Sequence, residues 1–278
     1  VNRPAVINIS IGGRVGPRDG SSPIDRYIEG QVKKGHIVIG AAGNEGRLPD
    51  HLYHEFAGTS DTLRTVVQWA KGQIPARTNI DCWSDVNGRL EGRIAIYNNL
   101  GQRLGSLKVM NTQPGTQIDS DTLSLPEGYF GLIYSTVRAN QNTNRKGRIL
   151  LAVGTNNPES YNCVLELWSA SEHVHCWNAG ENLLDSLPNG FSLPEWTGGD
   201  TLNTINEIGG TGKKTITVGA YTTTNKFTWL GGVERDIFFP TALGDFAPFS
   251  SRGPSTDGRV KPEIMAPGNS ILSALSSG

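Results

Sequence analysis

The chain has 278 residues and a formal net charge of −1, which is enough for one large domain or two ordinary ones with a buried core. That charge gives no electrostatic case for nucleic acid or an anionic membrane as a partner. No apolar run approaches the roughly 20 residues that span a bilayer. With 35 glycines, 15 prolines and 18% charged residues, the composition suits a loop-rich, β-containing protein of the extracellular type.

The chain begins with a short apolar strand, Val6–Ile9, without an initiator methionine or a signal peptide before it, which predicts a piece of a longer protein. A helix is expected next: Ser22 is a good N-cap, Pro23 suits the first helical position, and Lys34 and Gly35 suit the end. The β-branched run Ile37–Ile39 then predicts a buried strand. Strand, helix and strand form a βαβ unit with parallel strands.

The run of small residues after Ile39 ends in Gly43-Asn44-Glu45-Gly46. The side-chain amide of Asn44 is thus placed among residues whose small side chains leave the main chain accessible. The carboxyl end of a strand in an open parallel sheet is where ligands bind, and a rigid amide is a good donor to a developing oxyanion. The alternative is an ordinary Asn-Glu-Gly turn.

The sequence pattern is different from residue 47 to residue 205, where short apolar runs alternate with turn signals such as Asn87-Gly88. This spacing, without helical periodicity, predicts an antiparallel sandwich or jelly roll. The expected strands are Leu63–Trp69, Ile80–Trp83, Arg93–Tyr97, Leu104–Val109, Gly128–Arg138, Arg148–Val153, Cys163–Trp168 and Val174–Trp177. After this region the sequence again shows the pattern of a parallel sheet, with strands expected at Ile216–Gly219 and Ile264–Ala266.

Five segments, taken in order, resemble the subtilisin-like serine peptidases (subtilases) over residues 5–46 and 206–275. They are Val6–Gly13, the Asn44 strand, Thr215–Ala220, Phe249–Pro254 and Lys261–Gly268. The resemblance implies an α/β fold: a partial subtilisin-like parallel sheet with flanking helices, made of residues 1–46 and 206–278. Residues 47–205 would be an inserted, jelly-roll-like β domain, similar in texture to that of the spore-germination proteases.

The resemblance assigns site residues by position. Asn44 matches the asparagine of the oxyanion hole. The segment that pairs with the extended substrate backbone matches Ser10, Ile11 and Gly12, and the opposite wall of the first specificity pocket matches Ala41, Ala42 and Gly43. Glu45 is expected either at the rim of that pocket, with a mild preference for a basic substrate side chain, or as a solvated turn carboxylate.

The family's Asp and His motifs precede the strand that matches Val6–Ile9, and its nucleophile follows the segment that matches Ala266–Gly268. We therefore expect a fragment of a serine endopeptidase that lacks the catalytic Asp, His and Ser and is inactive alone. Gly58-Thr59-Ser60 imitates the nucleophile motif, but Asp61-Thr62 follows it instead of small residues. The alternative is a pseudopeptidase whose β insert binds protein or glycan. A third hypothesis is that the insert restricts access to the cleft or guides maturation.

Other chemistry-bearing residues receive structural interpretations. His51 and His54 do not match the His-Glu-x-x-His metal helix, and His173 and His175 alternate on one strand face, where packing is the default. The expected place of five tryptophans is the sandwich core rather than a carbohydrate platform: Trp69, Trp83, Trp168, Trp177 and Trp196.

An odd cysteine count allows at most one disulfide. Cys163 and Cys176 could meet across neighbouring strands, while Cys82 would stay free. No cofactor is expected, and structural calcium, known in the family, is left open. The expected partner is a polypeptide substrate. The Val6–Ile9 edge is expected to pair with another molecule, to be covered by a rearranged segment, or to make the fragment prone to self-association. The resemblance also implies a secreted or periplasmic location.

Overall fold

The computed structural model describes residues 3–69, 72–169, 173–179, 181–228, 231–237, 239–269 and 271. The chain separates into two compact units, which we describe individually. The parallel-sheet unit comprises Val1–Gly13, Arg18–Arg47 and Leu202–Gly278. The sandwich unit comprises Arg14–Pro17 and Leu48–Thr201.

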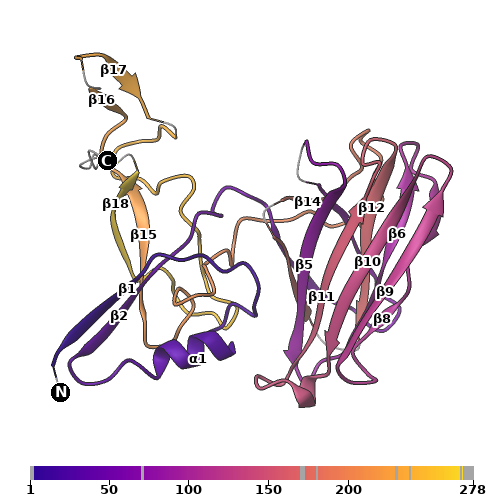
Figure 1. Ribbon diagram of the computed structural model, residues 1–278, viewed down its shortest axis with the longest axis horizontal. Helices are drawn as coiled ribbons and strands as arrows, with labels where there is room; N and C mark the ends of the chain where they lie inside the picture. The colour runs from indigo at the N-terminus through magenta and orange to yellow at the C-terminus, as the bar shows by residue number, and fades with distance from the viewer. Residues whose placement is uncertain are drawn as a thin grey trace. The chain divides into compact units, whose positions relative to one another are not determined.

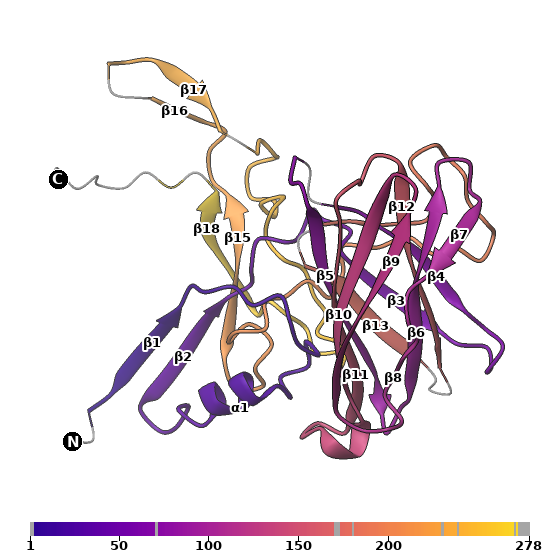
Figure 2. The same ribbon diagram turned by 45° about the vertical axis from the view of Figure 1, so that its right-hand side comes forward.

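Four parallel strands form the sheet of the parallel-sheet unit, in the order β1-β2-β15-β18 (Figures 1 and 2). Their bounds are β1 Ala5–Ile9, β2 His36–Ala41, β15 Ile216–Thr222 and β18 Ile264–Asn269. All four overlap predicted strands, and the parallel pairing of β1 with β2 confirms the βαβ interpretation of the first three elements. The chain thus brings segments about 200 residues apart into one sheet.

One face of this sheet is apolar and exposed. Val6 pairs with Ile37, Ile39 pairs with Ile216, and Val218 pairs with Ile264, so these side chains share a face because paired residues point to the same side. The exposed fractions are 68% for Val6, 46% for Ile37, 37% for Ile216 and 51% for Ile264. The expectation that Ile37–Ile39 is fully buried is therefore wrong: on β2 only Val38, which points to the opposite face, and Gly40 are buried.

Helix α1, Pro23–Glu29, lies between β1 and β2 in the chain. Its start is as predicted, with the hydroxyl of Ser22 accepting a hydrogen bond from the backbone N–H of Asp25 and Pro23 at the first position. Its predicted end is wrong, because the helix stops at the Gly30 cap instead of reaching Lys34. Glycine is unfavourable inside a helix. Only Asp25 and Ile28 of the helix are buried.

The α/β fold class with flanking helices is wrong. Among the described residues, α1 is the single α-helix, apart from the one-turn 3₁₀ helix η1 at Ala139–Gln141, and most strands belong to antiparallel sheets. The β15–β18 connection carries a two-stranded hairpin instead of a helix, formed by β16 Lys226–Thr228 and β17 Glu234–Asp236. No described helix is both long and apolar enough to cross a membrane.

Two antiparallel sheets form the sandwich unit (Figure 2). The first has the order β3-β13-β5-β11-β10-β9, with bounds β3 His51–Glu55, β5 Ala76–Val86, β9 Gln117–Leu125, β10 Gly128–Val137, β11 Lys146–Thr155 and β13 His173–Asn178. The second has the order β14-β4-β12-β6-β7, with β8 paired to β6. Its bounds are β4 Leu63–Val67, β6 Leu90–Asn98, β7 Arg103–Ser106, β8 Met110–Asn111, β12 Tyr161–Ser169 and β14 Leu183–Leu184.

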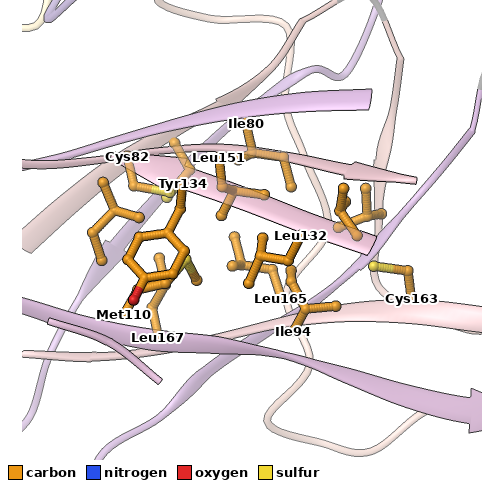
Figure 3. Close-up of a cluster of buried hydrophobic side chains, with 14 of the residues drawn as sticks. Ile80, Cys82, Ile94, Met110, Leu132, Tyr134, Leu151, Cys163, Leu165 and Leu167 are labelled. Atoms are coloured by element: carbon orange, nitrogen blue, oxygen red, sulfur yellow. The ribbon is translucent and has the colours of Figure 1, made fainter. Parts of the chain in front are cut away.

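The hydrophobic core of the sandwich unit lies between these two sheets. Figure 3 shows Ile80, Leu132 and Leu151 of the first sheet facing Ile94 and Leu165 of the second. All eight predicted strands are present. The sequence analysis missed β3, β8, β9 and β14, which are very short or rich in polar residues.

The three cysteines are all buried and free, so the disulfide between Cys163 and Cys176 is wrong. Cys163 lies on β12 of one sheet, whereas Cys176 lies on β13 of the other, directly opposite Cys82 of β5. Burial raises the pKa of the Cys163 thiol, which keeps it in the unreactive protonated form.

Two carboxyl groups are buried together in the parallel-sheet unit. The Asp25 carboxylate accepts a hydrogen bond from the hydroxyl of Thr211 at 2.7 Å, and the Glu207 carboxylate accepts one from the backbone N–H of Arg18 at 2.9 Å. Burial raises the pKa of Asp25 to about 6. Burial, together with the neighbouring Asp25 charge, raises the pKa of Glu207 to about 8. The folded chain therefore holds protons that the unfolded chain releases.

This pair predicts a pH dependence of stability. Between the ordinary pKa of Glu207, 4.5, and its folded value of about 8, the folded state binds more protons than the unfolded state, so the free energy of unfolding falls as pH rises. We expect Glu207→Gln to flatten this slope and to stabilise the protein above pH 8. Urea unfolding between about pH 5 and 9 measures it. The exposed control Glu234→Gln should keep the wild-type slope, and equal slopes for both variants would contradict the prediction.

The outer edge of β1 predicts self-association. Among the described strands β1 pairs with β2 alone, and an unpaired apolar edge is a template for another strand. We expect a concentration-dependent rise in sedimentation coefficient that Val6→Lys suppresses. The matched control is Val260→Lys, at an exposed valine outside the strands. A monomer at all concentrations would rule out association through this edge.

Candidate active site

A cavity of about 270 Å³ opens at the carboxyl ends of the parallel strands. It is lined by Asn8, Ser10, Ile39, Gly40, Ala41, Ala42, Gly43, Asn44, Val218, Gly219, Ala220, Phe249, Ser250, Ala266, Pro267 and Gly268. Small residues dominate this lining, so much of the cavity surface is main chain. All these residues belong to the parallel-sheet unit.

Asn44 lines this cavity three residues beyond the end of β2. Its side chain is exposed and makes no hydrogen bond with any residue that the structure describes. A fixed backbone with a free side-chain amide is the arrangement needed to donate to an oxygen atom that enters the cavity.

The backbone of Asn44 is fixed by two buried side chains. The Glu45 carboxylate accepts hydrogen bonds from the backbone N–H of Asn44 at 2.8 Å and from the hydroxyl of Ser251 at 3.0 Å. The Ser251 hydroxyl in turn accepts from the backbone N–H of Glu45 at 3.0 Å, and the Ser251 backbone N–H donates to the carbonyl of Gly43 at 3.1 Å. The Phe249–Pro254 segment therefore holds the turn that carries Asn44.

Glu45 is placed differently from both sequence expectations. It is buried, so the alternative of a solvated turn carboxylate is wrong. It is not among the residues that line the cavity either, and its Oε2 faces Asn44 and Ser251. In this structure Glu45 fixes the backbone of Asn44 through a hydrogen bond.

A glycine is required beside this turn. Gly43 has a φ of +113°, and a Cβ atom there would lie 2.6 Å from both Glu45 Oε2 and Ser251 Oγ. Any larger residue would therefore displace the two groups that hold Asn44.

The two predicted walls of the cleft are joined by Asn206, a residue that the sequence analysis did not single out. Its side-chain amide donates to the carbonyl of Ile11 and accepts from the backbone N–H of Gly13. Its own backbone N–H donates to the carbonyl of Ala42 at 2.7 Å. One buried residue thereby ties the segment after β1 to the segment after β2.

The predicted wall residues are therefore brought together, though they differ in exposure to the cavity. Ser10 on one side and Ala41, Ala42 and Gly43 on the other line it directly. Ile11 and Gly12 are exposed beside it, and a Cβ atom built on Gly12 would meet nothing within 4 Å. The open main chain at Gly12 leaves room for an extended polypeptide to lie alongside.

Other candidate residues belong to the sandwich unit. Gly58-Thr59-Ser60 forms a turn before β4, in the sandwich unit. His51 donates to the Asp200 carboxylate, and its other ring nitrogen lies 2.9 Å from Nδ1 of His175. Burial, then the neighbouring His51, lowers the pKa of His175 to about 2, so this ring is neutral. The described residues contain no group of three or more His, Cys, Asp or Glu suited to a metal ion.

Comparison with known proteins identifies the family of this chain. Residues 135–278 match the model of the subtilase family, a range that includes the segments from Thr215 to Gly268 and leaves out residues 5–46. The chain belongs to the subtilase family, whose members are of the serine peptidase kind.

A solved structure, that of the Clostridium perfringens CspB protease, is similar in fold. The alignment covers 99% of this chain at 18% sequence identity, with a TM-score of 0.63. It covers 51% of that protein's chain, so the present chain spans about half the length of the protein it matches.

The bridge made by Asn206 predicts a measurable stability change. Asn206→Ala removes three side-chain hydrogen bonds, those with the Ile11 carbonyl and with the backbone N–H groups of Gly13 and Ile208, at a cost of about 1–3 kcal/mol in the free energy of unfolding. Urea unfolding measures the loss. The control Asn8→Ala removes an exposed amide that makes no hydrogen bond with the described residues. Equal losses of unfolding free energy in the two variants would show that the hydrogen bonds of Asn206 do not stabilise the fold.

Proposed function

We propose that this chain is the substrate-cleft and oxyanion part of a subtilisin-like serine endopeptidase, which hydrolyses peptide bonds through an acyl-enzyme. The observation that carries the proposal is the free Asn44 amide at the mouth of a cavity with two main-chain walls. In this proposal, sequence outside residues 1–278 supplies the catalytic Asp, His and Ser, so the chain is inactive alone.

The exposed sheet face supports the proposal that further segments belong to the fold. Parallel sheets occur almost only with both faces covered, yet Val6, Ile37 and Ile264 are exposed on one face here. Exposed apolar patches of this kind mark surfaces that another segment or partner covers. Coverage of about half of the similar solved chain agrees with this.

The proposed chemistry gives each part of the cleft a task. The substrate backbone would lie between Ser10–Gly12 and Ala41–Gly43, where main-chain pairing gives affinity without a demand on sequence. When a serine hydroxyl attacks the scissile carbonyl, the carbonyl carbon becomes tetrahedral and its oxygen gains negative charge. The side-chain N–H of Asn44 would donate to that oxygen, with its position held by Glu45 and Ser251.

Subtilases are often secreted, and we propose a secreted or periplasmic location for the parent protein. A polypeptide is the proposed substrate.

A serine-directed fluorophosphonate probe tests the reaction class. We expect the full-length protein that contains this chain to be labelled, and prior treatment with an unlabelled fluorophosphonate to block the label. Failure to label correctly folded full-length protein would contradict the peptidase proposal and favour a pseudopeptidase with the same cleft.

Asn44→Ala in the full-length protein tests the role of the amide. Loss of one such donor in subtilisin lowers kcat by roughly 10²–10³-fold, and we expect a loss of that size with little change in KM. Because the side chain of Asn44 makes no hydrogen bond with the described residues, the thermal midpoint should not move. The control Asn140→Ala, at an exposed residue of η1, should keep full activity. An unchanged kcat in Asn44→Ala would remove Asn44 from the mechanism.

A further inference from the structure

A second and larger cavity, of about 690 Å³, lies wholly within the sandwich unit. Its described lining comes from the start of β12 and from connections next to β4, β5, β6, β12 and β14. It consists of Gln68, Trp69, Gly72, Gln73, Ile74, Asn99, Pro158, Glu159, Asn162, Pro188 and Asn189. Its volume is within the range of about 300–1,000 Å³ found for small-ligand sites. We propose that this cavity is a binding site for a neutral oligosaccharide.

The aromatic wall of the cavity is Trp69, just beyond the end of β4. One side of the indole packs against the core, with its ring centroid 6.3 Å from that of Phe130. The side chain is only partly buried, and its ring N–H makes no hydrogen bond with any described residue. A pyranose presents C–H groups on one face and hydroxyls at its rim. An indole with a free N–H therefore offers both an apolar surface and a donor.

The polar wall is built before any ligand arrives. Asn162 donates to the side-chain oxygen of Asn99 at 2.9 Å, and the side chain of Asn99 donates to the carbonyl of Glu159 at 3.1 Å. Asn189 donates to the backbone carbonyl of Asn99. Asn99 thus ties three connections together, and a site fixed in advance loses less conformational entropy when it binds.

Several polar groups in this wall remain available. The side chain of Gln68 and the carboxylate of Glu159 make no hydrogen bond or ion pair with the described residues. Asn162 uses its amide N–H₂ on Asn99, and its side-chain oxygen has no donor among the described residues. Amides both donate and accept, and a carboxylate accepts. Hydroxyl groups, which also do both, are the matching chemistry, and the Glu159 charge disfavours an anionic ligand.

Binding is measured on two arrays, one of neutral oligosaccharides and one of uronic-acid and sulfated oligosaccharides. Calorimetry then measures the affinity of the oligosaccharide that binds best. We expect the protein to bind at least one neutral oligosaccharide, and to bind the anionic set more weakly. Failure to bind any neutral oligosaccharide, or preference for the anionic set, would overturn the proposal.

Variants locate the binding. Gln68→Ala and Glu159→Ala remove groups that bond to nothing else described, so folding should be unchanged, and the double variant should weaken binding at least tenfold. Trp69→Ala should abolish binding, while Trp69→Phe keeps an aromatic face if the alanine variant is unstable. The control Trp168→Ala removes an indole of β12 whose N–H already donates to Glu91. Binding that survives the Gln68/Glu159 double variant would place the saccharide elsewhere.

This test is separate from that of the peptidase. Fluorophosphonate labelling of the full-length protein depends on its nucleophile and cleft, whereas saccharide binding depends on the sandwich cavity, so either proposal can fail while the other stands.

Discussion

A hydrogen-bonded bridge through the buried amide of Asn206 holds the two walls of the candidate cleft at their separation. Its side chain satisfies Ile11 and Gly13 after β1, and its backbone satisfies Ala42 after β2. Strand pairing alone ends at Ile9 and Gly40, so beyond that point nothing in the sheet ladder fixes how the two segments diverge. The bridge extends the constraint into the cleft, where the geometry matters for a bound chain.

The turn that carries Asn44 depends on a second constraint of the same kind. The side chains of Glu45 and Ser251 form hydrogen bonds with this turn, and Gly43, which has no Cβ atom and a left-handed conformation, leaves space for both. Catalytic donors are effective when they cost no reorganisation at the moment of reaction. An exposed amide on a rigid, buried support meets that condition. The role proposed for Asn44 is consistent with the position of Glu45, which binds the Asn44 backbone and does not line the cavity.

The sandwich unit uses its core and its loops for different purposes. Between the sheets, Ile80, Leu132 and Leu165 pack in the hydrophobic core. At the end where Asn99 and Asn162 meet, the connections expose amides and one side of Trp69. The sequence interpretation of Trp69 as a core residue is half right, because the same indole contacts the core and lines a cavity.

Patterns among adjacent residues were sufficient to predict much of the secondary structure of this protein. The short apolar runs and the Ser22-Pro23 helix start predicted the four parallel strands, the start of α1 and the eight sandwich strands, since each signal lies within a few adjacent residues. Only the tertiary structure decided the fold class, the free state of Cys163 and Cys176, the burial of Glu45 and the role of Asn206. Those depend on partners far away in sequence, such as Ser251, 206 residues from Glu45, and on which faces of the sheets are covered. Neither can be read from adjacent residues.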